Sequence, residues 1–415
     1  MTESVKNLLK TLGPGIVFAG MCIGVSHLVQ STRAGADYGF VLLPAVLAAV
    51  IFKYPFFEFS SRYTSATGKS ILYGYDNLGR WILWLYGIVN VLTMFIVTAA
   101  IAFVAAGLMS TILQVEIGAD ALAALILLVC VIILAGGKYS ALDGLLKVVS
   151  TVLLISTLVA AFVAFNKGVK PPVEGFIPNE VMSVVGITFL IALMGWMPTA
   201  VDMSAWTGLW AEERVKQTKY IPTLKETLLD FNIGYAITGV LAVVFLSLGA
   251  LVMYGTGIEL SNNSTGFASQ LISLYTTSIG EWSYLIIAVA AFSTMFSTSI
   301  TVLDGYGRAM NKVFVIITGQ EKKWNYTFWV VVVALGAYLV LSQYLNNLKS
   351  LVDLATTISF VIAPLAAILN YKVIFSSEVN KDLQPPLWLK NLARAGIVFL
   401  SVFTLIYFYV LIVGL

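Results

Sequence analysis

The sequence predicts an all-α integral membrane protein with eleven transmembrane spans, of which the first and the sixth are broken at mid-membrane. Composition gives the first indication: of 415 residues, 59% are hydrophobic and only 11% are charged. Soluble proteins carry roughly 25% charged residues. This chain therefore has too few charges to cover a surface that faces water, and we expect it to be surrounded by a lipid bilayer.

Apolar runs long enough to cross a bilayer core, which takes about 20 residues, occur eleven times. The connections between them are short, so residues 1–415 form one membrane domain without a separate soluble domain. The runs lie near residues 11–33, 38–61, 80–112, 118–136, 144–166, 181–210, 230–254, 282–312, 325–344, 351–375 and 389–413.

The distribution of Lys and Arg predicts the orientation, because cytoplasmic loops carry an excess of both. With the N-terminus inside, 20 of the 24 Lys and Arg residues fall on the cytoplasmic side and four fall outside. We expect a protein of the plasma (inner) membrane with a cytoplasmic N-terminus and an external C-terminus. Charges near span ends, including Lys53, are interpreted as snorkelling residues or ion pairs.

Two broken spans indicate where a substrate binds. The first is interrupted at Gly24-Val25-Ser26-His27 and the sixth at Gly195-Trp196-Met197-Pro198-Thr199-Ala200. Unwound backbone survives in a membrane only where it lines a protected cavity. Breaks at corresponding places in two halves of a chain are typical of transporters with inverted repeats. Residues 1–166 and 181–375 would be the two five-span repeats, and residues 389–413 an additional helix.

The residues also resemble a known family. The segment LGPGIVFAGMCIGVSHLVQSTRAGADYGF, from Leu12 to Phe40, resembles the first-helix signature of Nramp divalent-metal transporters. Met197-Pro198 resembles the Met-Pro at the sixth-helix break of that family. The resemblance implies the LeuT fold, a five-plus-five inverted repeat followed here by one more helix, and transport by alternating access.

This sequence departs from the family at the metal ligands. The Asp and Asn of the Nramp first-helix break are replaced by Gly24 and His27, and the two histidines of the sixth helix by Thr199 and Ser204. Of the ligands that the resemblance implies, Met197 is retained. The metal-binding and proton-transfer groups of the family are therefore largely missing.

These replacements favour an anion as the substrate. The half-helices that restart near Ser26 and Thr199 present free N–H groups and positive dipole ends, which bind anions. With Gly24 in place of the family Asp, we expect no carboxylate to oppose that field. The predicted substrate, a small anion such as bicarbonate or a small carboxylate, would contact Gly24, Val25, Ser26, His27, Gly195, Trp196, Met197, Thr199 and Ala200.

The eighth span suggests a sodium site, since residues 291–301 contain six hydroxyl side chains. In symporters of the LeuT fold, which this chain resembles, two hydroxyls of this helix face carbonyls of the broken first helix. Gly24, Thr294, Ser297 and Thr298 match that arrangement. Anion uptake against an inside-negative potential costs ~2.3 kcal/mol per charge per 100 mV, so Na⁺ is the expected coupling ion, and no cofactor is expected.

Other functions were weighed. A divalent-metal transporter with a rebuilt site would use His27, Met197 and Asp202 as ligands. No clustered nucleophile and base indicates an enzyme, and a net charge of +3 gives no indication of nucleic-acid binding. Residues 65–70, SATGKS, end like a phosphate-binding P-loop but lack its first glycine. The oligomeric state stays open, and a monomer is compatible with the sequence.

Overall fold

The computed structural model describes residues 11–114, 117–137, 139–344 and 347–414, without the side chains of residues 139–150 and 323. Every regular element in these ranges is a helix. Seven helices are each long and apolar enough to cross a membrane. They are α4 (Leu43–Thr67), α6 (Arg80–Leu113), α11 (Leu224–Val252), α13 (Tyr284–Thr318), α14 (Lys323–Leu341), α15 (Leu348–Ile374) and α16 (Leu387–Val413).

Four further spans complete the set. The first is broken: α2 (Pro14–Cys22) ends at a turn, and the chain resumes as the π-helix η1 (Ser26–Ser31) and α3 (Thr32–Tyr38), with a bend of 42°. The helices α7 (Ala119–Ala135) and α8 (Tyr139–Lys167) correspond to the fourth and fifth predicted spans. The second broken span comprises α9 (Val184–Gly195), the 3₁₀ turn η2 (Val201–Met203) and α10 (Ser204–Thr218).

The eleven predicted spans therefore all correspond to helices, and both predicted breaks are confirmed. The first break lies slightly earlier than expected, because the helix has already restarted at Val25. The elements between spans are α5 (Ile71–Leu78), α12 (Ser264–Ile279), η3 (Glu281–Ser283) and η4 (Lys381–Leu383). Five cations that contribute to the predicted topology, Lys6, Lys10, Lys138, Lys147 and Lys323, fall outside the described side chains.

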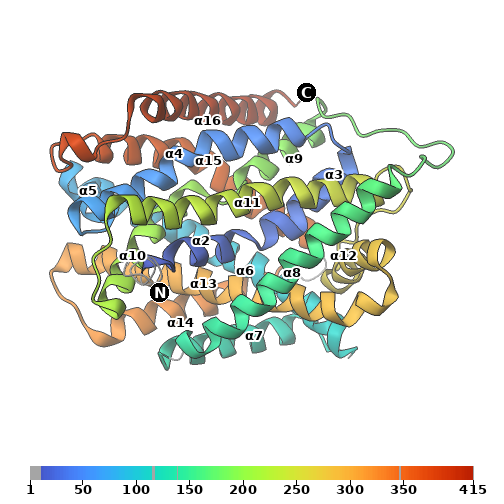
Figure 1. Ribbon diagram of the computed structural model, residues 1–415, viewed down its shortest axis with the longest axis horizontal. Coiled ribbons are helices and arrows are strands. Elements are labelled where there is room, and N and C mark those ends of the chain that lie inside the picture. The colour runs from blue at the N-terminus through green and yellow to red at the C-terminus, as the bar shows by residue number, and fades with distance from the viewer. Residues whose placement is uncertain (1–10, 115–116, 138, 345–346, 415) are drawn as a thin grey trace, which may run out of the picture.

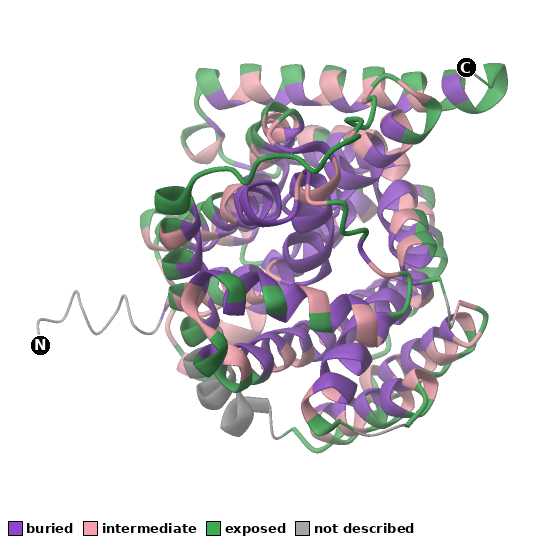
Figure 2. Cartoon of the chain, turned by 90° about the vertical axis from the view of Figure 1, so that its right-hand side faces the viewer, coloured by how far each residue is buried: buried purple, intermediate pink, exposed green. Residues whose placement is uncertain are grey.

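The broken spans lie inside the bundle (Figure 1), where most residues are buried (Figure 2). The last helix, α16, packs along one side against α4 and α15. Only 17% of the residues in its most apolar segment are buried, and its outer face is exposed in Figure 2. The helix α16 is therefore a peripheral element of the bundle.

The first span is held along α11 by glycine contacts and by a capping carboxylate. A Cβ on Gly35 would lie 1.9 Å from the carbonyl oxygen of Leu246, and one on Gly249 would lie 2.2 Å from that of Thr32. At the opposite end, Asp230 accepts hydrogen bonds from the backbone N–H groups of Gly13 (3.1 Å) and Gly15 (2.7 Å). Glycine is required at 35 because the two backbones touch there.

We expect Gly35→Ala to destabilise the fold, because the added methyl group must push α3 away from α11. Overpacking of this kind costs about 1–3 kcal/mol, which would lower the midpoint of thermal unfolding of the detergent-solubilised protein. Gly87→Ala is the matched control, since its Cβ would stand 3.4 Å from Val313 and alanine favours a helix over glycine by roughly 0.5–1 kcal/mol. Equal midpoints for the two variants would contradict the close contact.

Candidate functional site

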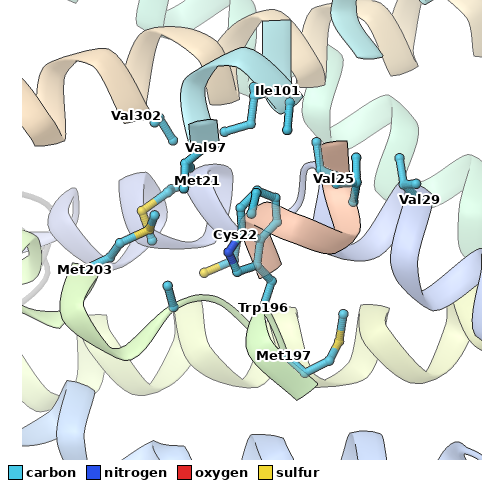
Figure 3. Close-up of a cluster of buried hydrophobic side chains, with 14 of the residues drawn as sticks. Met21, Cys22, Val25, Val29, Val97, Ile101, Trp196, Met197, Met203 and Val302 are labelled. Atoms are coloured by element: carbon cyan, nitrogen blue, oxygen red, sulfur yellow. The ribbon is translucent and has the colours of Figure 1, made fainter. Parts of the chain in front are cut away.

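A small cavity lies where the two broken spans meet α6 and α13. Its volume is about 20 Å³, enough for one water-sized ligand. Figure 3 shows residues of the first broken span, among them Met21 and Val25, facing Trp196 and Met203 of the second. Ten residues line it: Met21, Val25, Ser26, Val97, Ile101, Trp196, Thr199, Met203, Thr298 and Val302.

Sequence reasoning identified half of this lining. Five predicted site residues line the cavity: Val25, Ser26, Trp196, Thr199 and Thr298. The other five were missed, because Val97 and Ile101 are ordinary apolar residues of an unbroken helix and carry no signal of function. Trp196 is fixed by a hydrogen bond from Nε1 to Ser359 Oγ (2.9 Å). The wall is mainly apolar, with three hydroxyl groups among the ten residues.

His27 lies next to the first break but is absent from the cavity lining. It is fully buried, and its Nε2 donates to the carbonyl of Thr238 on α11 (2.9 Å). Its Nδ1 lies 2.7 Å from both Ser26 Oγ and the carbonyl oxygen of Cys22. Both ring nitrogens are thus engaged in contacts that tie the restarted helix to α2 and α11.

The other predicted contacts at the second break are buried around the cavity rather than lining it. Met197 is fully buried, and its sulfur accepts a weak contact from Ser31 Oγ at 3.5 Å. Gly195 packs so closely on α15 that a Cβ there would lie 2.0 Å from the carbonyl oxygen of Thr356. Ala200 and Gly24 are also buried and line no part of the cavity.

Lys53 is the main feature that sequence reasoning misassigned. It is fully buried, and its ammonium donates to the carbonyls of Met194 (2.5 Å), Gly195 (2.8 Å) and Thr199 (3.2 Å). The interpretation of Lys53 as a snorkelling or ion-paired residue at a span end is therefore wrong. Its three N–H groups bind carbonyls that the break deprives of helical partners, at the negative end of the α9 dipole.

Asp202 occupies the other side of the same break. It is 3% exposed and sits in the first turn after the break, at the positive end of the α10 dipole. No described residue hydrogen-bonds to its Oδ1. The expectation that no carboxylate opposes the field of the restarted half-helices is therefore wrong at the second break, where Asp202 does so.

The predicted sodium residues meet the first broken span. Thr298 Oγ1 lies 3.0 Å from the carbonyl oxygens of Gly20 and Thr294. A Cβ on Gly24 would lie 3.0 Å from the same hydroxyl, and one on Gly20 would lie 3.9 Å from Ser297 Oγ. The structure thus brings these hydroxyls and the end of α2 together. The hydroxyl of Thr294 has no partner among the described residues.

An ion pair joins the first broken span to α15. Arg33 Nη1 and Nη2 donate to the carboxylate of Asp353 on α15 at 2.6 and 3.1 Å. Gln30 donates to the same carboxylate at 3.0 Å and to Thr356 Oγ1 at 3.2 Å. Arg33 is 5% exposed, so this buried bidentate pair ties the start of α3 to α15.

The family model described as "Natural resistance-associated macrophage protein-like", Nramp, matches residues 15–410. This chain belongs to the Nramp family. Nramp proteins are membrane transporters, and membership agrees with the expectation that the chain is not an enzyme.

Relatives of this Nramp protein support the same fold. An uncharacterized protein of Pasteurella multocida is 35% identical over 424 residues, covering 98% of this chain and 95% of the relative. A manganese transporter of Eremococcus coleocola superposes with a TM-score of 0.74 at 12% identity, covering 97% and 87% of the two chains. The MhsT structure with L-phenylalanine gives a TM-score of 0.61 at 13% identity, with 95% and 97% covered. The LeuT-type fold is confirmed.

We expect Lys53→Met to destabilise this Nramp protein strongly. The variant keeps the apolar stem but leaves three buried carbonyls without a donor, at about 1–3 kcal/mol for each group left unsatisfied. The midpoint of thermal unfolding in detergent should fall accordingly. Lys372→Met, at an exposed position on α15, should change stability by no more than about 0.5 kcal/mol. A Lys53→Met protein as stable as that control would show that the ammonium does not hold the break.

Proposed function

We propose that this Nramp protein is a secondary transporter that moves a small ion by alternating access, with the ion bound between the two broken spans. Three observations support the proposal. The family match covers residues 15–410, the fold is shared with a solved manganese transporter, and the cavity at the crossing of the breaks has the size of a single small ion. The charge distribution supports a cytoplasmic N-terminus.

The first candidate cargo is a divalent metal ion. Family membership supports it, and several of the similar structures are of one manganese transporter, that of Eremococcus coleocola. The observation that carries it within this chain is Asp202, a buried carboxylate at the second break with one oxygen unpartnered. Hard divalent ions bind carboxylate and carbonyl oxygens. Of the predicted set, Met197 and His27 would contribute less, since both are engaged by neighbouring groups.

The ligand set is sparse, which shapes what the site could bind. No group of three or more His, Cys, Asp and Glu side chains suited to a metal occurs among the described residues. A metal would therefore depend on Asp202, backbone carbonyls and water. Lys53 lies in the same region, and the charge of its ammonium would weaken binding of a divalent cation.

Lys53 favours a second candidate, Na⁺-coupled symport of a small anion such as bicarbonate. A buried ammonium beside the second break raises the local electrostatic potential, which favours an anion. Thr298, Ser297 and the carbonyl of Gly20 provide neutral oxygen atoms suited to a hard monovalent ion. A metal ion would be stabilised by the negative charge of Asp202 and an anion by the positive charge of Lys53. Substitutions at the second break therefore distinguish the two candidates.

Uptake by proteoliposomes decides between the cargoes. For a metal transporter, Mn²⁺ should quench an enclosed metal-sensitive dye with saturable kinetics, and Asp202→Asn should reduce the rate at least about tenfold, since it removes the one ionised ligand. Asp382→Asn, at an exposed surface position, is the control and should transport normally. Absence of Mn²⁺ uptake by folded protein, together with Na⁺-driven bicarbonate uptake, would reverse the order of the candidates.

The sodium residues can be tested separately. If the anion is moved with Na⁺, replacing Ser297 and Thr298 together by Ala should abolish the stimulation of bicarbonate uptake by Na⁺, because both side-chain ligands are lost. Ser299→Ala removes a hydroxyl that bonds within its own helix, to Met295 at 2.9 Å, and should leave the stimulation intact. Full Na⁺ stimulation in the double variant would refute this sodium site.

A further inference from the structure

A second, larger cavity lies at the end of the bundle that the charge distribution assigns to the cytoplasm. Its volume is about 390 Å³, within the range of about 300–1,000 Å³ of small-molecule sites. It is enclosed by the end of α4, α5, α10, the start of α11 and α13, which lie near one another on the left of Figure 1. It shares no lining residue with the small cavity between the broken spans.

Positive charge dominates the wall of this cavity. Lys69 from the connection between α4 and α5, Lys216 from α10 and Lys312 from α13 line it, and Glu212 is the one acidic residue in the lining. Lys312 pairs with Glu212 at 2.7 Å, and Lys216 pairs at 2.7 Å with a carboxylate outside the lining, that of Glu213. The three ammonium groups outnumber the one carboxylate that faces the cavity, so a bound anion would be favoured.

Two of the cations contact the same aromatic ring. Lys69 Nζ and Lys312 Nζ each lie 5.5 Å from the centre of the Tyr73 ring. No carboxylate among the described residues forms an ion pair with Lys69. Both positive charges therefore lie near this ring, and each would attract an anion bound beside it.

The remaining wall suggests what kind of anion fits. Thr227 is 8% exposed, its hydroxyl has no hydrogen-bond partner among the described residues, and it lines the cavity. A buried hydroxyl without a partner can be satisfied by a ligand that accepts its hydrogen bond. Val215, Ile221 and Pro222 form an apolar part of the same wall. The site therefore offers charge and a hydroxyl group to an anionic head and an apolar surface to the rest of the molecule.

We propose that this cavity binds a phosphate-bearing ligand with an apolar portion. Lysines bind phosphate as point charges, and basic pockets on the cytoplasmic side of membrane proteins hold lipid head groups. The same chemistry is offered by an anionic phospholipid and by a soluble organic phosphate. Either ligand would bridge α10, which belongs to the second broken span, to α4 and α13.

Direct binding to the full-length protein tests the proposal without reference to the transported ion. Delipidated protein in neutral detergent is titrated with phenyl phosphate, a soluble organic phosphate with an apolar ring, and binding is measured by calorimetry. In parallel, protein in nanodiscs of phosphatidylcholine with or without phosphatidylglycerol is analysed for retained lipid by native mass spectrometry. Binding of the soluble compound identifies a free phosphate as the ligand, and selective retention of phosphatidylglycerol identifies a lipid.

Matched double variants locate the binding. Neutralising Lys69 and Lys216 together with Gln should weaken binding roughly 25-fold, at about fivefold for each lysine. The control pair Lys322→Gln and Lys381→Gln removes the same charge at exposed positions outside the cavity and should bind like the parent. Thr227→Val, which keeps the side-chain shape, should weaken binding about threefold by removing the buried donor.

The outcomes are decisive in both directions. Loss confined to the Lys69 and Lys216 pair, or to Thr227→Val if that pair does not fold, supports the site. The proposal is overturned if neither probe binds the parent protein, or if the folded cavity pair binds as tightly as the control pair.

Discussion

The architecture of the second broken span depends on one buried ammonium group. In a membrane, each backbone carbonyl that a helix break exposes must find a partner inside the protein. Lys53 supplies that partner for the carbonyls of Met194, Gly195 and Thr199. Because α4 carries this lysine, the break is built by two spans that are far apart in the sequence. Without the amine, a continuous helix or water would have to satisfy the same oxygens.

The charges at this break are arranged in the order that the helix dipoles favour. Lys53 binds the carboxyl end of α9, and Asp202 stands in the first turn of the half-helix that follows. The two charges oppose one another across an unwound segment, so the region is closer to neutral than the loss of the family aspartate suggested. The small cavity is correspondingly apolar, with hydroxyl groups rather than carboxylates in its lining.

The sequence was sufficient to predict the spans and both breaks. The length of each apolar run determines the spans, and Gly, Pro and Ser residues within a run mark where the helix breaks. The predicted contact between Thr298 and backbone carbonyls of the first span is also present in the structure. The prediction for Lys53 is wrong because the apolar run ends at residue 61, which places the lysine near a span end. In the structure α4 extends to Thr67, so the lysine lies in the middle of the helix. The orientation of His27 depends on the bend and the π-helical turn at the break, which no periodicity in the sequence encodes.

The two halves of the first span are anchored to different parts of the bundle. Asp230 of α11 holds the start of α2, whereas Asp353 of α15 holds the arginine of α3. Between these anchors lies a turn with a bend of 42°. The two halves of the span are therefore fixed by contacts that share no residue, so loss of the Asp230 contacts would leave the Arg33–Asp353 pair intact, and the reverse also holds.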